Sequence, residues 1–536
     1  MKARFLALSL ALALLISLFS VSVSAADEIT YPVEGGDLYF DPATGTVTKC
    51  DFAVTAAEIP PEIGGVPVTA IGNLAFENCE ALASVSIPDT VTSIGRHAFA
   101  YCHSLTEITL PDSVYKIEDQ AFFDCTALKK VDLGRGVLLI GRDILWGTAY
   151  LRNGDNWKDG LLYAGDILIK ADTALTGVVK LPENTRVVAG SAFYACTSLT
   201  AVILPQGLQT IGTEGFYYCI DLEQLELPDS LSYIGEAAFR YCASLREVKS
   251  GSGLEQIGKS AFEYCGKLSK VTLGRQLKDI GSYAFAECDE LTEIRFLGDA
   301  PKLGEYPFDT YSYSAKEYAP TPGLSLCYVS CTSGWESPHW KGYPTKTWHP
   351  SDSFTDVPPS SWFCTSVDYA LCKGLMNGVS ATQFAPEEPM TRAMLVTVLW
   401  RYAGAPNEGT IHFSDVPEGT WYTEAVAWAS HSGVVNGVGN GCFEPDGAIT
   451  REQMAVILHR YCGSIGIDTA ARAELSTFPD AAKISSYAAE ALSWAVKTGL
   501  ITGSAQGGEV YLEPQGDATR AQVATVLMRL IENILQ

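Results

Sequence analysis

Basic residues and histidines are scarce in this sequence. Among its 536 residues, 37 Lys and Arg stand against 62 Asp and Glu, which gives a formal net charge of −25 at pH 7. A chain with this excess of negative charge is a poor partner for nucleic acid. The seven His residues are scattered, and a zinc site needs four convergent side chains. We therefore expect no nucleic-acid partner, no metal site and no cofactor.

Familiar catalytic signatures are also missing. The sequence contains neither a Gly-x-Ser-x-Gly nucleophile elbow nor a His-Glu-x-x-His zinc motif. Carboxylates are plentiful, so an unusual hydrolase stays open. The sequence nevertheless favours a protein that is not an enzyme.

Long apolar runs are absent after the first twenty residues. Lys2 and Arg4 precede an apolar run at 5–19, and small residues follow at 23–26. This is the pattern of a secretory signal peptide, which we expect at residues 1–26. The alternative is a membrane anchor, but no basic stop-transfer segment follows. No other stretch is long enough to span a bilayer, so we expect an exported protein without an integral membrane segment after signal cleavage.

One repeated unit dominates what the sequence does contain. An Ile or Val recurs every 23 residues, with one 48-residue step between the fourth and fifth positions. The positions are Ile71, Ile94, Ile117, Ile140, Val188, Ile211, Ile234, Ile257 and Ile280. Phe follows five residues later and Cys eight residues later in all copies but one, and Leu always follows after eleven. A fixed period in the twenties predicts a solenoid.

Each unit combines a strand pattern with a turn pattern. Residues 82–88 have apolar side chains at alternate positions and predict a short strand. The Gly-x-x-Ala-Phe-x-x-Cys half predicts a tight helical or 3₁₀ turn. One unit cannot bury its apolar face alone, so each Phe should be covered by the Phe of the units on either side. We expect the Cys column to hold buried, reduced thiols, and Cys327 with Cys331 to be the best disulfide candidate.

The run Ile-Gly-x-x-Ala-Phe-x-x-Cys-x-x-Leu-x-x-Val-x-Leu-Pro resembles the BspA-like leucine-rich repeat family, over about residues 30–345. The resemblance implies an α/β leucine-rich-repeat solenoid of 23-residue repeats with short parallel strands, in a surface protein of adhesion or interaction. We expect an N-terminal cap at 27–70 and repeats at 71–296, with an irregular repeat at about 141–187. A C-terminal cap and linker should follow at 297–350.

Two parts of this region leave alternatives open. Within the irregular repeat, residues 159–163 and 166–170 predict two extra strands. The insertion is either a hinge or binding protrusion, or a tolerated insertion. Residues 297–350 are rich in Tyr and Trp, which suits either a packed cap or an aromatic platform for a sugar.

Outward strand positions of the solenoid vary while its core columns do not. These positions, thirteen and fifteen residues after the repeat Ile, form the candidate recognition face. It comprises Glu107, Lys130, Asp132, Gln224, Glu226, Glu247, Lys249, Lys270, Glu293 and Arg295. A mixed, charged surface is compatible with protein or glycan recognition and equally with plain solvation.

After residue 350 the pattern changes to three related segments, 351–407, 408–470 and 471–536. Each opens with Phe-x-Asp, continues into an amphipathic stretch that ends at a Gly, and closes with a Thr-Arg motif that begins a second helix. The opening aspartates are Asp356, Asp415 and Asp480, and the arginines are Arg392, Arg451 and Arg520.

The Thr-Arg-x-Gln motif has one residue that local structure does not explain. Thr is a good N-cap, and Gln three residues later completes a capping box. Arg opposes the helix dipole in the first turn. Together with the free N–H groups there, it suits a carboxylate or phosphate ligand. The alternative is that each Arg pairs with a segment-opening Asp as a structural bridge.

These segments resemble three tandem S-layer homology (SLH) domains, through Phe-x-Asp-Val, Trp, Asn-Gly, Phe-x-Pro and Thr-Arg. The resemblance implies an α-dominated, pseudo-three-fold bundle that binds secondary cell-wall polysaccharide, commonly with pyruvylated sugars. The implied binding residues are Arg392, Arg451, Arg520, Asp356, Asp415, Asp480, Trp362, Trp421, Gly378 and Gly437. Met394 departs from the usual Glu or Gln, and Tyr487 replaces the third Trp.

Taken together, the sequence predicts an exported protein of the cell wall or S-layer, in a wall of Gram-positive type. Its C-terminal arginines would hold wall glycan, with avidity from three copies. Its solenoid would meet a host or bacterial surface protein or glycan. Two alternatives stay open: a structural S-layer or envelope component without a dedicated ligand, and a wall-associated enzyme of unrecognised type.

Overall fold

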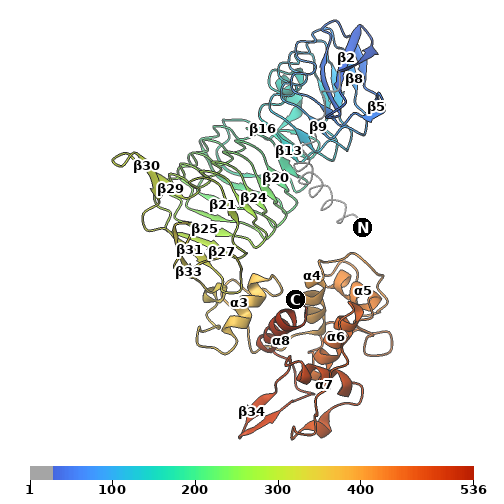
Figure 1. Ribbon diagram of the computed structural model, residues 1–536, viewed down its shortest axis with the longest axis vertical. Helices are drawn as coiled ribbons and strands as arrows, with labels where there is room; N and C mark the ends of the chain where they lie inside the picture. Colours follow the sequence, from blue (N-terminus) through green and yellow to red (C-terminus); the bar gives the residue numbers. More distant parts are fainter. Residues whose placement is uncertain (1–27, 536) are drawn as a thin grey trace. The chain divides into compact units, whose positions relative to one another are not determined.

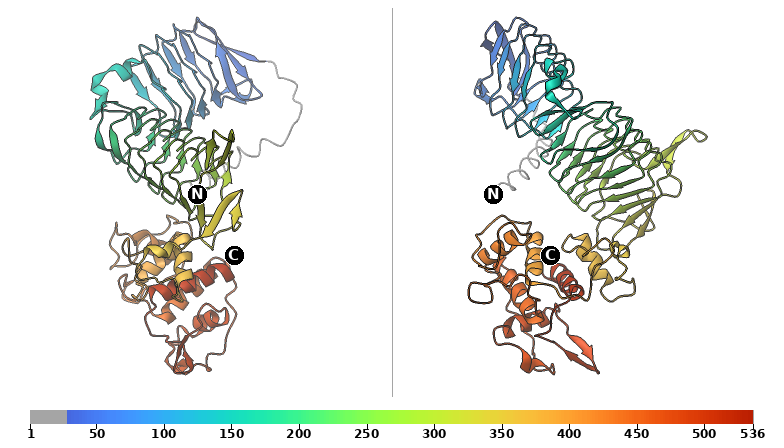
Figure 2. Two further views of the ribbon diagram at one scale, coloured as in Figure 1. Left: turned by 90° about the vertical axis from the view of Figure 1, so that its left-hand side faces the viewer. Right: turned by 180° about the vertical axis from the view of Figure 1, so that it is seen from behind.

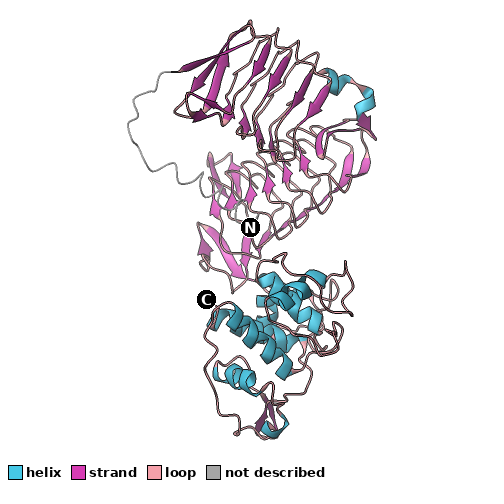
Figure 3. Ribbon diagram, turned by 90° about the vertical axis from the view of Figure 1, so that its right-hand side faces the viewer, coloured by secondary structure: helices cyan, strands magenta, loops and turns pink. Residues whose placement is uncertain are grey.

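The computed structural model describes residues 28–535, so the expected signal peptide lies outside the described residues. The chain divides into two compact units (Figure 1). They are built from residues up to 294, 300–326 and 341–344, and from residues 295–299, 327–340 and 345 onward. Strands make up the first unit, the solenoid, and helices dominate the second (Figure 3).

Each solenoid repeat contributes two short strands, which enter two separate parallel sheets. The sheet nearest the N-terminus contains β1 (Ile29–Val33), β2 (Gly36–Asp41), β3 (Thr46–Cys50), β7 (Ala70–Ile71), β9 (Ser93–Ile94), β11 (Lys116–Ile117) and β13 (Leu139–Ile140), in that order. β1, β2 and β3 are antiparallel, whereas β3 pairs with β7 in parallel. The last strand of this hairpin region therefore carries the hydrogen-bonding pattern into the repeats.

Two longer sheets follow. One contains β14 (Trp157–Lys158), β15 (Leu161–Ala164), β16 (Ile167–Ala171), β18 (Val187–Val188), β20 (Thr210–Ile211), β22 (Tyr233–Ile234), β24 (Gln256–Ile257), β26 (Asp279–Ile280) and β28 (Lys302–Leu303). The other runs through β17 (Gly177–Lys180), β19 (Leu199–Ile203), β21 (Gln224–Glu226), β23 (Glu247–Lys249), β25 (Lys270–Leu273), β27 (Glu293–Phe296), β31 (Ser325–Tyr328) and β33 (Tyr343–Thr347). Smaller pairs are β4 (Ala56–Glu58) with β8 (Ser84–Ser86), β5 (Glu62–Ile63) with β6 (Val66–Pro67), β10 (Glu107–Thr109) with β12 (Lys130–Asp132), and β29 (Asp309–Ser312) with β30 (Glu317–Pro320).

The Gly-x-x-Ala-Phe-x-x-Cys half of a repeat is a run of turns rather than a helix. Its third and seventh residues have positive φ, for example 64° at Leu74 and 62° at Asn78, which an α-helix does not contain. N–H groups of this stretch donate to the neighbouring repeat, as from Phe76 to the Ala98 carbonyl at 2.7 Å. The α/β description of the solenoid is therefore wrong: bonds that would close a helix run between repeats, and the solenoid is built of strands and turns.

The Phe column forms a continuous stack in the solenoid core. The rings of Phe76 and Phe99 lie 4.9 Å apart with 11° between their planes. From Phe193 to Phe285 every neighbouring pair is stacked, with centroids 4.6–5.1 Å apart. All of these rings are fully buried. The prediction that each Phe covers its neighbours is confirmed, and the column is interrupted only where Leu145 replaces Phe.

The eight members of the Cys column are buried, as predicted, and none of them is bridged to another member of the column. Inside a stack the thiol donates to a carbonyl of the preceding repeat, as from Cys219 to Phe193 at 3.2 Å. Cys327 and Cys331, the best disulfide candidate of the sequence, are not bridged in the structure. Cys331 instead hydrogen-bonds with Cys372, and this contact lowers the pKa of the Cys331 thiol.

The irregular repeat inserts a hairpin into the stack. β15 and β16 are antiparallel, as the two extra strand patterns predict, and β16 then pairs in parallel with β18. Arg142 forms a bridge with Gly190, and Arg186 Nη1 donates to the Val137 carbonyl at 2.8 Å. These bonds tie together the repeats before and after the insertion, where the stack changes direction (Figure 2). A short helix, α2 (Ala149–Arg152), and a 3₁₀ turn, η2 (Gly154–Asn156), lie within it.

Each C-terminal segment folds into two helices around one shared apolar core. The helices are α3 (Cys364–Cys372), α4 (Arg392–Tyr402), α5 (Thr423–His431), α6 (Arg451–Ser464), α7 (Ala489–Lys497) and α8 (Arg520–Asn533). The second helix of each segment packs on the first helix of the next, α4 with α5 and α6 with α7, and α8 packs back on α3. The unit also contains β32 (His339–Trp340), η3 (Pro350–Ser353), η4 (Ala481–Lys483), β34 (Ser504–Gln506) and β35 (Glu509–Tyr511). Within residues 28–535, none of the helices combines the length and the apolar character that crossing a bilayer requires.

Candidate functional site

The three Thr-Arg motifs begin the second helix of each segment. The N-caps are Thr391, Thr450 and Thr519, and each side chain accepts a hydrogen bond from the N–H three residues on. Gln453 and Gln522 complete capping boxes, as predicted. In the first segment Met394 stands at the equivalent position and its side chain has no amide to close the box.

Backbone N–H groups of the three arginines are already hydrogen-bonded. Each donates at 2.9 Å to a carbonyl in another segment's loop. The acceptors are Gly447 for Arg392, Gly516 for Arg451 and Glu388 for Arg520. The expectation that free N–H groups of the first turn help to bind an anion is therefore wrong. The guanidinium groups are what remains for an anionic ligand.

Two of the arginines stack on an aromatic ring from another segment. Arg392 Nε donates to the Phe443 carbonyl at 2.8 Å, and its guanidinium lies 4.9 Å from the centre of the Phe443 ring. Arg520 has the same geometry on Phe384, with distances of 2.8 and 4.7 Å. Each guanidinium is thus fixed against the Phe-x-Pro loop of a neighbouring segment by a hydrogen bond and a cation–π contact.

Arg451 lacks this support because Leu512 stands where the other loops have Phe. Its Nη1 lies 3.3 Å from Ser504 Oγ and 3.7 Å from Glu513 Oε2. The side chain is 9% exposed, and its Nε is buried without a hydrogen-bond partner among the described residues. A buried, unpartnered N–H of a cation is destabilising, so the protein satisfies the Arg451 guanidinium less well than those of Arg392 and Arg520.

Burial lowers the pKa of Arg392, Arg451 and Arg520. Nearby carboxylates act in the opposite direction, foremost Glu444 on Arg392, Glu513 on Arg451 and Asp356 on Arg520. Guanidinium groups stay protonated in proteins. Their lowered pKa therefore reflects charge that is poorly solvated, which an anionic ligand would stabilise.

The segment-opening aspartates hold backbone rather than arginine. Asp415 accepts hydrogen bonds from the N–H groups of Phe443 and Glu444 at 2.8 and 2.7 Å. Asp356 and Asp480 make the same pair of bonds to the corresponding loops. Throughout the described part of the chain, no ion pair within 4.0 Å joins these aspartates to the three arginines, so the structural-bridge alternative is wrong. The aspartates shape the loops on which the arginines rest.

One groove of about 570 Å³ brings together side chains from all three segments. Its wall includes Trp362 from the first segment, Arg451 from the second, and the 502–504 loop with Gln522 and Arg529 from the third. We call this the arginine groove. Its volume falls in the range of small-ligand sites. The indole of Trp362 is 63% exposed and free to meet a ligand.

The other two arginines have related surroundings. Tyr487, from the third segment, acts on the pKa of Arg392 in the first. Trp421 and Tyr487 are exposed to a similar degree as Trp362, at 58% and 59%. Sequence comparison within one segment does not reveal these neighbours, because Trp362 lies in one groove with Arg451 and Tyr487 acts on Arg392, each from a different segment.

The predicted glycines have a packing role. A Cβ on Gly378 would lie 2.4 Å from the Phe354 ring, and one on Gly437 would lie 2.7 Å from the Phe413 ring. Both sites therefore exclude a side chain because the segment-opening Phe packs there.

On the solenoid, seven of the ten residues of the candidate recognition face are exposed, whereas Lys270, Glu293 and Arg295 are half-buried. Strand residues alternate between exposed and buried, as in β21 and β23, where Gln224, Glu226, Glu247 and Lys249 are exposed. Lys130 forms an ion pair with Glu107 on the next strand at 3.1 Å. This surface is charged, and none of its ten residues lines either of the two pockets found on the turn side of the repeats.

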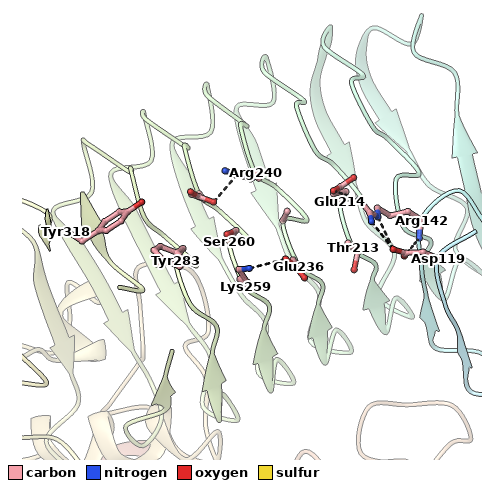
Figure 4. A pocket seen from close by; sticks show the side chains of 12 residues that line it. Asp119, Arg142, Thr213, Glu214, Glu236, Arg240, Lys259, Ser260, Tyr283 and Tyr318 are labelled. Carbon is pink, nitrogen blue, oxygen red and sulfur yellow. Dashed lines mark hydrogen bonds and ion pairs between the residues drawn. The ribbon is translucent and has the colours of Figure 1, made fainter. Parts of the chain in front are cut away.

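A cleft of about 440 Å³ lies instead on the turn side of the solenoid (Figure 4). It is lined by Asp119, Arg142, Thr213, Glu214, Glu236, Ala237, Arg240, Lys259, Ser260, Glu263, Tyr283 and Tyr318. Arg142 contacts Asp119 and Glu214 at 2.9 and 3.0 Å, and Arg240 lies 2.9 Å from Glu263. We call this the turn-face cleft. None of its residues belongs to the predicted recognition face. The charged residues two, three and six positions after the repeat Ile vary from repeat to repeat, and this variation is the sequence feature that could have indicated the cleft.

Two local features resemble other kinds of site. Residues 253–260 match the Gly-x-x-x-x-Gly-Lys-Ser sequence motif of a phosphate-binding loop. However, β24 lies within them and no helix follows directly, so this stretch is an ordinary part of a repeat. His349, Cys364 and Asp368 bring potential metal ligands within 4.8 Å of one another. Asp368 is already occupied there, accepting from Ser351 N at 2.9 Å and contacting His349 Nδ1 at 2.6 Å.

Comparison with known proteins assigns both units. A BspA type leucine rich repeat region, in six copies, matches residues 61–155 and 172–292, and an S-layer homology domain matches 353–393, 412–455 and 477–524. The chain is a BspA-type leucine-rich repeat protein with three SLH domains. Both resemblances stated from the sequence are thereby confirmed.

Several characterised proteins share part of this chain. The surface-layer 125 kDa protein of Lysinibacillus sphaericus is 31% identical over 30% of the chain and 13% of its own length. The S-layer protein sap of Bacillus anthracis is 30% identical over 33% and 21%, and the amylopullulanase of Thermoanaerobacterium thermosulfurigenes is 28% identical over 34% and 10%. The chain thus spans about a fifth or less of the length of these relatives.

Solved structures also resemble the BspA-type protein. The pneumococcal vaccine antigen PcpA is 19% identical, with a TM-score of 0.31 over 61% of this chain and 98% of that one. A leucine rich cell surface protein of Faecalibacterium prausnitzii is 23% identical, with a TM-score of 0.27 over 52% and 97%.

Proposed function

We propose that the SLH domains anchor this protein to a secondary cell-wall polysaccharide and that the solenoid is displayed for recognition of a protein or glycan. The SLH assignment and the similarity to S-layer proteins support a place at the cell wall. Both kinds of module bind or anchor rather than catalyse, so the function is binding. The amylopullulanase among the relatives matches this chain over only 10% of its own length, so we do not assign its activity to this chain.

The observation that carries the anchoring proposal is the arginine groove. Arg451 lies in it with a buried Nε that no described residue satisfies, and the exposed indole of Trp362 lies in the same groove. Guanidinium binds a carboxylate through paired hydrogen bonds, and an indole face offers the C–H side of a sugar a broad apolar surface. A sugar that carries a carboxylate, such as a pyruvyl ketal, combines both groups.

We infer a pseudo-three-fold arrangement of the three SLH domains. Helix packing supports it, because each second helix meets the first helix of the next segment and the last closes on the first. Hydrogen bonds from Arg392 to Gly447, from Arg451 to Gly516 and from Arg520 to Glu388 follow the same cyclic order. On this arrangement Trp362 serves Arg451, Trp421 serves Arg520 and Tyr487 serves Arg392.

A double-mutant cycle on purified wall sacculi tests the composite groove. Trp362→Ala and Arg451→Ala are made singly and together, and the dissociation constant is measured for each variant. Because the two side chains contact one ligand, their effects should be non-additive, with a coupling of about 0.5–3 kcal/mol. Trp362 is exposed, so its substitution leaves the fold intact.

The matched control is Trp421→Ala with Arg451→Ala, two residues of one segment. On the composite account these belong to different grooves, so their effects should add. Coupling of Arg451 to Trp421 and not to Trp362 would mean that each segment binds by itself, and the composite groove would be rejected.

For the solenoid we propose that the turn-face cleft is the recognition site. It is concave and lined by both signs of charge together with Tyr283 and Tyr318. The strand face stays a candidate for wider contacts. Exchange of Arg240 for Ala should remove binding to an identified partner, while exchange of exposed Glu247 on the strand face should not.

A further inference from the structure

The first cysteine of the Cys column differs from those that follow it. Inside the stack, the Cys102 and Cys125 thiols donate to carbonyls of Phe76 and Phe99 at 3.1 and 3.0 Å. Cys79 begins the column and has no repeat before it. Its contact to a carbonyl, that of Asp51, is 3.9 Å long. The thiol–carbonyl hydrogen bond that occupies an interior cysteine is therefore weak at Cys79.

A second sulfur lies where the column would continue. Cys50 is the last residue of β3, and its Sγ lies 2.7 Å from Cys79 Sγ. This separation is well inside the contact distance of two unbonded sulfur atoms. Both residues are buried, at 9% and 1% exposed.

We propose that Cys50 and Cys79 form a disulfide that fastens the N-terminal strands to the first repeat. Adjacent sulfurs at the open end of the stack carry the proposal, together with the weak alternative hydrogen bond of Cys79. The site is a redox modification site, and its reaction partner is a disulfide donor, either an oxidised dithiol oxidase or glutathione disulfide.

The reaction is thiol–disulfide exchange in two steps. The Cys79 thiolate attacks the donor disulfide, forms a mixed disulfide and releases one donor thiolate. The Cys50 thiolate then attacks the Cys79 sulfur, and the second donor thiolate leaves. The two protons from the protein thiols pass to the two donor thiolates, so the protein is oxidised by two electrons and the donor is reduced by two. Because both sulfurs are buried in the fold, we place the exchange in the folding of this region in an oxidising compartment.

The bond would seal an end of the solenoid that has one neighbour only. Repeats are stabilised by the repeats on both sides, so the terminal strands open most easily. Cys50 and Cys79 are 29 residues apart, and closing that loop restricts the unfolded chain. The second stack offers a natural control. Cys196 begins it and has a similarly long contact of 3.7 Å to the Asp172 carbonyl, but within residues 28–535 it makes no sulfur–sulfur hydrogen bond.

Peptide mass spectrometry tests the proposal on the full chain, secreted into the bacterial periplasm and purified without reductant. Free thiols are blocked with iodoacetamide in denaturant, and the protein is digested with trypsin. The peptide from Cys50 to Arg96 contains these two cysteines and no other, so its mass alone reports their state. We expect it two hydrogen atoms lighter than the dithiol and without a blocking group, while the Cys102 and Cys196 peptides are blocked.

Thermal unfolding gives a second readout that does not depend on digestion. Reductant should lower the Tm of the wild type by several degrees and leave the Tm of Cys50→Ser unchanged, while Cys196→Ser responds as the wild type does. A peptide from Cys50 to Arg96 that carries two blocking groups, or a disulfide from either residue to another cysteine, overturns the proposal. So does a Tm that is insensitive to reductant in the wild type.

Discussion

Single residues in the SLH domains divide into those that shape loops and those left for a ligand. The resemblance places the segment-opening aspartates among the binding residues, but both carboxylate oxygens of Asp415 accept hydrogen bonds from backbone N–H groups. The arginines keep guanidinium N–H groups that the protein only partly satisfies, most clearly at Arg451. We therefore propose that Asp415 acts on binding through the loop that supports Arg392.

The Asp415 carboxylate gives a prediction for pH dependence. Burial raises its pKa, but hydrogen bonds from the Phe443 and Glu444 amides outweigh this and the pKa is lowered overall. A lowered folded-state pKa contributes stability above the unfolded pKa, and this contribution is lost as pH falls through the folded value. The stability gap between wild type and Asp415→Asn should be constant from about pH 7 to about pH 5 and shrink below about pH 4.

Urea unfolding midpoints at several pH values measure this gap. Asp446→Asn, at an exposed carboxylate of the same segment, is the control and should show no such gap. A gap that widens as the pH falls contradicts the assigned role.

The structural roles of residues could be predicted from the sequence where those roles depend on neighbours close in the chain. Thr450 with Gln453 forms the capping box that the Thr-Arg-x-Gln spelling indicates. The binding surroundings of Arg520 could not be predicted in this way, because its side chain meets Phe384 at a separation of 136 residues. Such contacts follow from tertiary packing, which a motif of four residues does not encode.

At the scale of elements, the solenoid turns show how a correct period can coexist with a wrong element. The 23-residue period fixes which side chains stack, and the Phe column follows it closely. The tight helical or 3₁₀ turn expected around Phe76 is replaced by a run of other turns, because N–H groups there donate to the next repeat. A pattern of apolar residues reports which face is buried but not whether the hydrogen bonds stay within the element.

The Phe stack gives a prediction for stability. Phe216 is fully buried between Phe193 and Phe239, with ring centroids 4.6 and 5.0 Å away. Phe216→Ala should lower the free energy of unfolding by about 3–5 kcal/mol, measured by urea denaturation. Tyr218→Ala, two residues away and 46% exposed, should change it by less than about 1 kcal/mol. Equal losses in the two variants would mean that the column does not carry the stability of the stack.

At the scale of the whole molecule, we propose that each of the three arginines forms part of a binding groove, so that one chain binds with avidity. Weak binding at each groove gives durable attachment when several sites act together. The net charge of −25 gives no general attraction to an anionic wall polymer, so affinity must come from local arginine contacts. Moderate salt should therefore weaken attachment, and the loss of one arginine should matter much less than the loss of all three.

The most direct test of the anchoring account is sedimentation of the protein with purified sacculi. Wild type is compared with the triple variant Arg392→Ala, Arg451→Ala and Arg520→Ala, on untreated sacculi and on sacculi stripped of pyruvate. Arg460→Ala, at an exposed arginine of α6, serves as control, and circular dichroism confirms that the variants are folded. The account predicts that binding is lost in the triple variant and after pyruvate removal, and is kept in the control. Binding that survives both treatments would show that the arginines are structural and that the SLH domains attach by another surface.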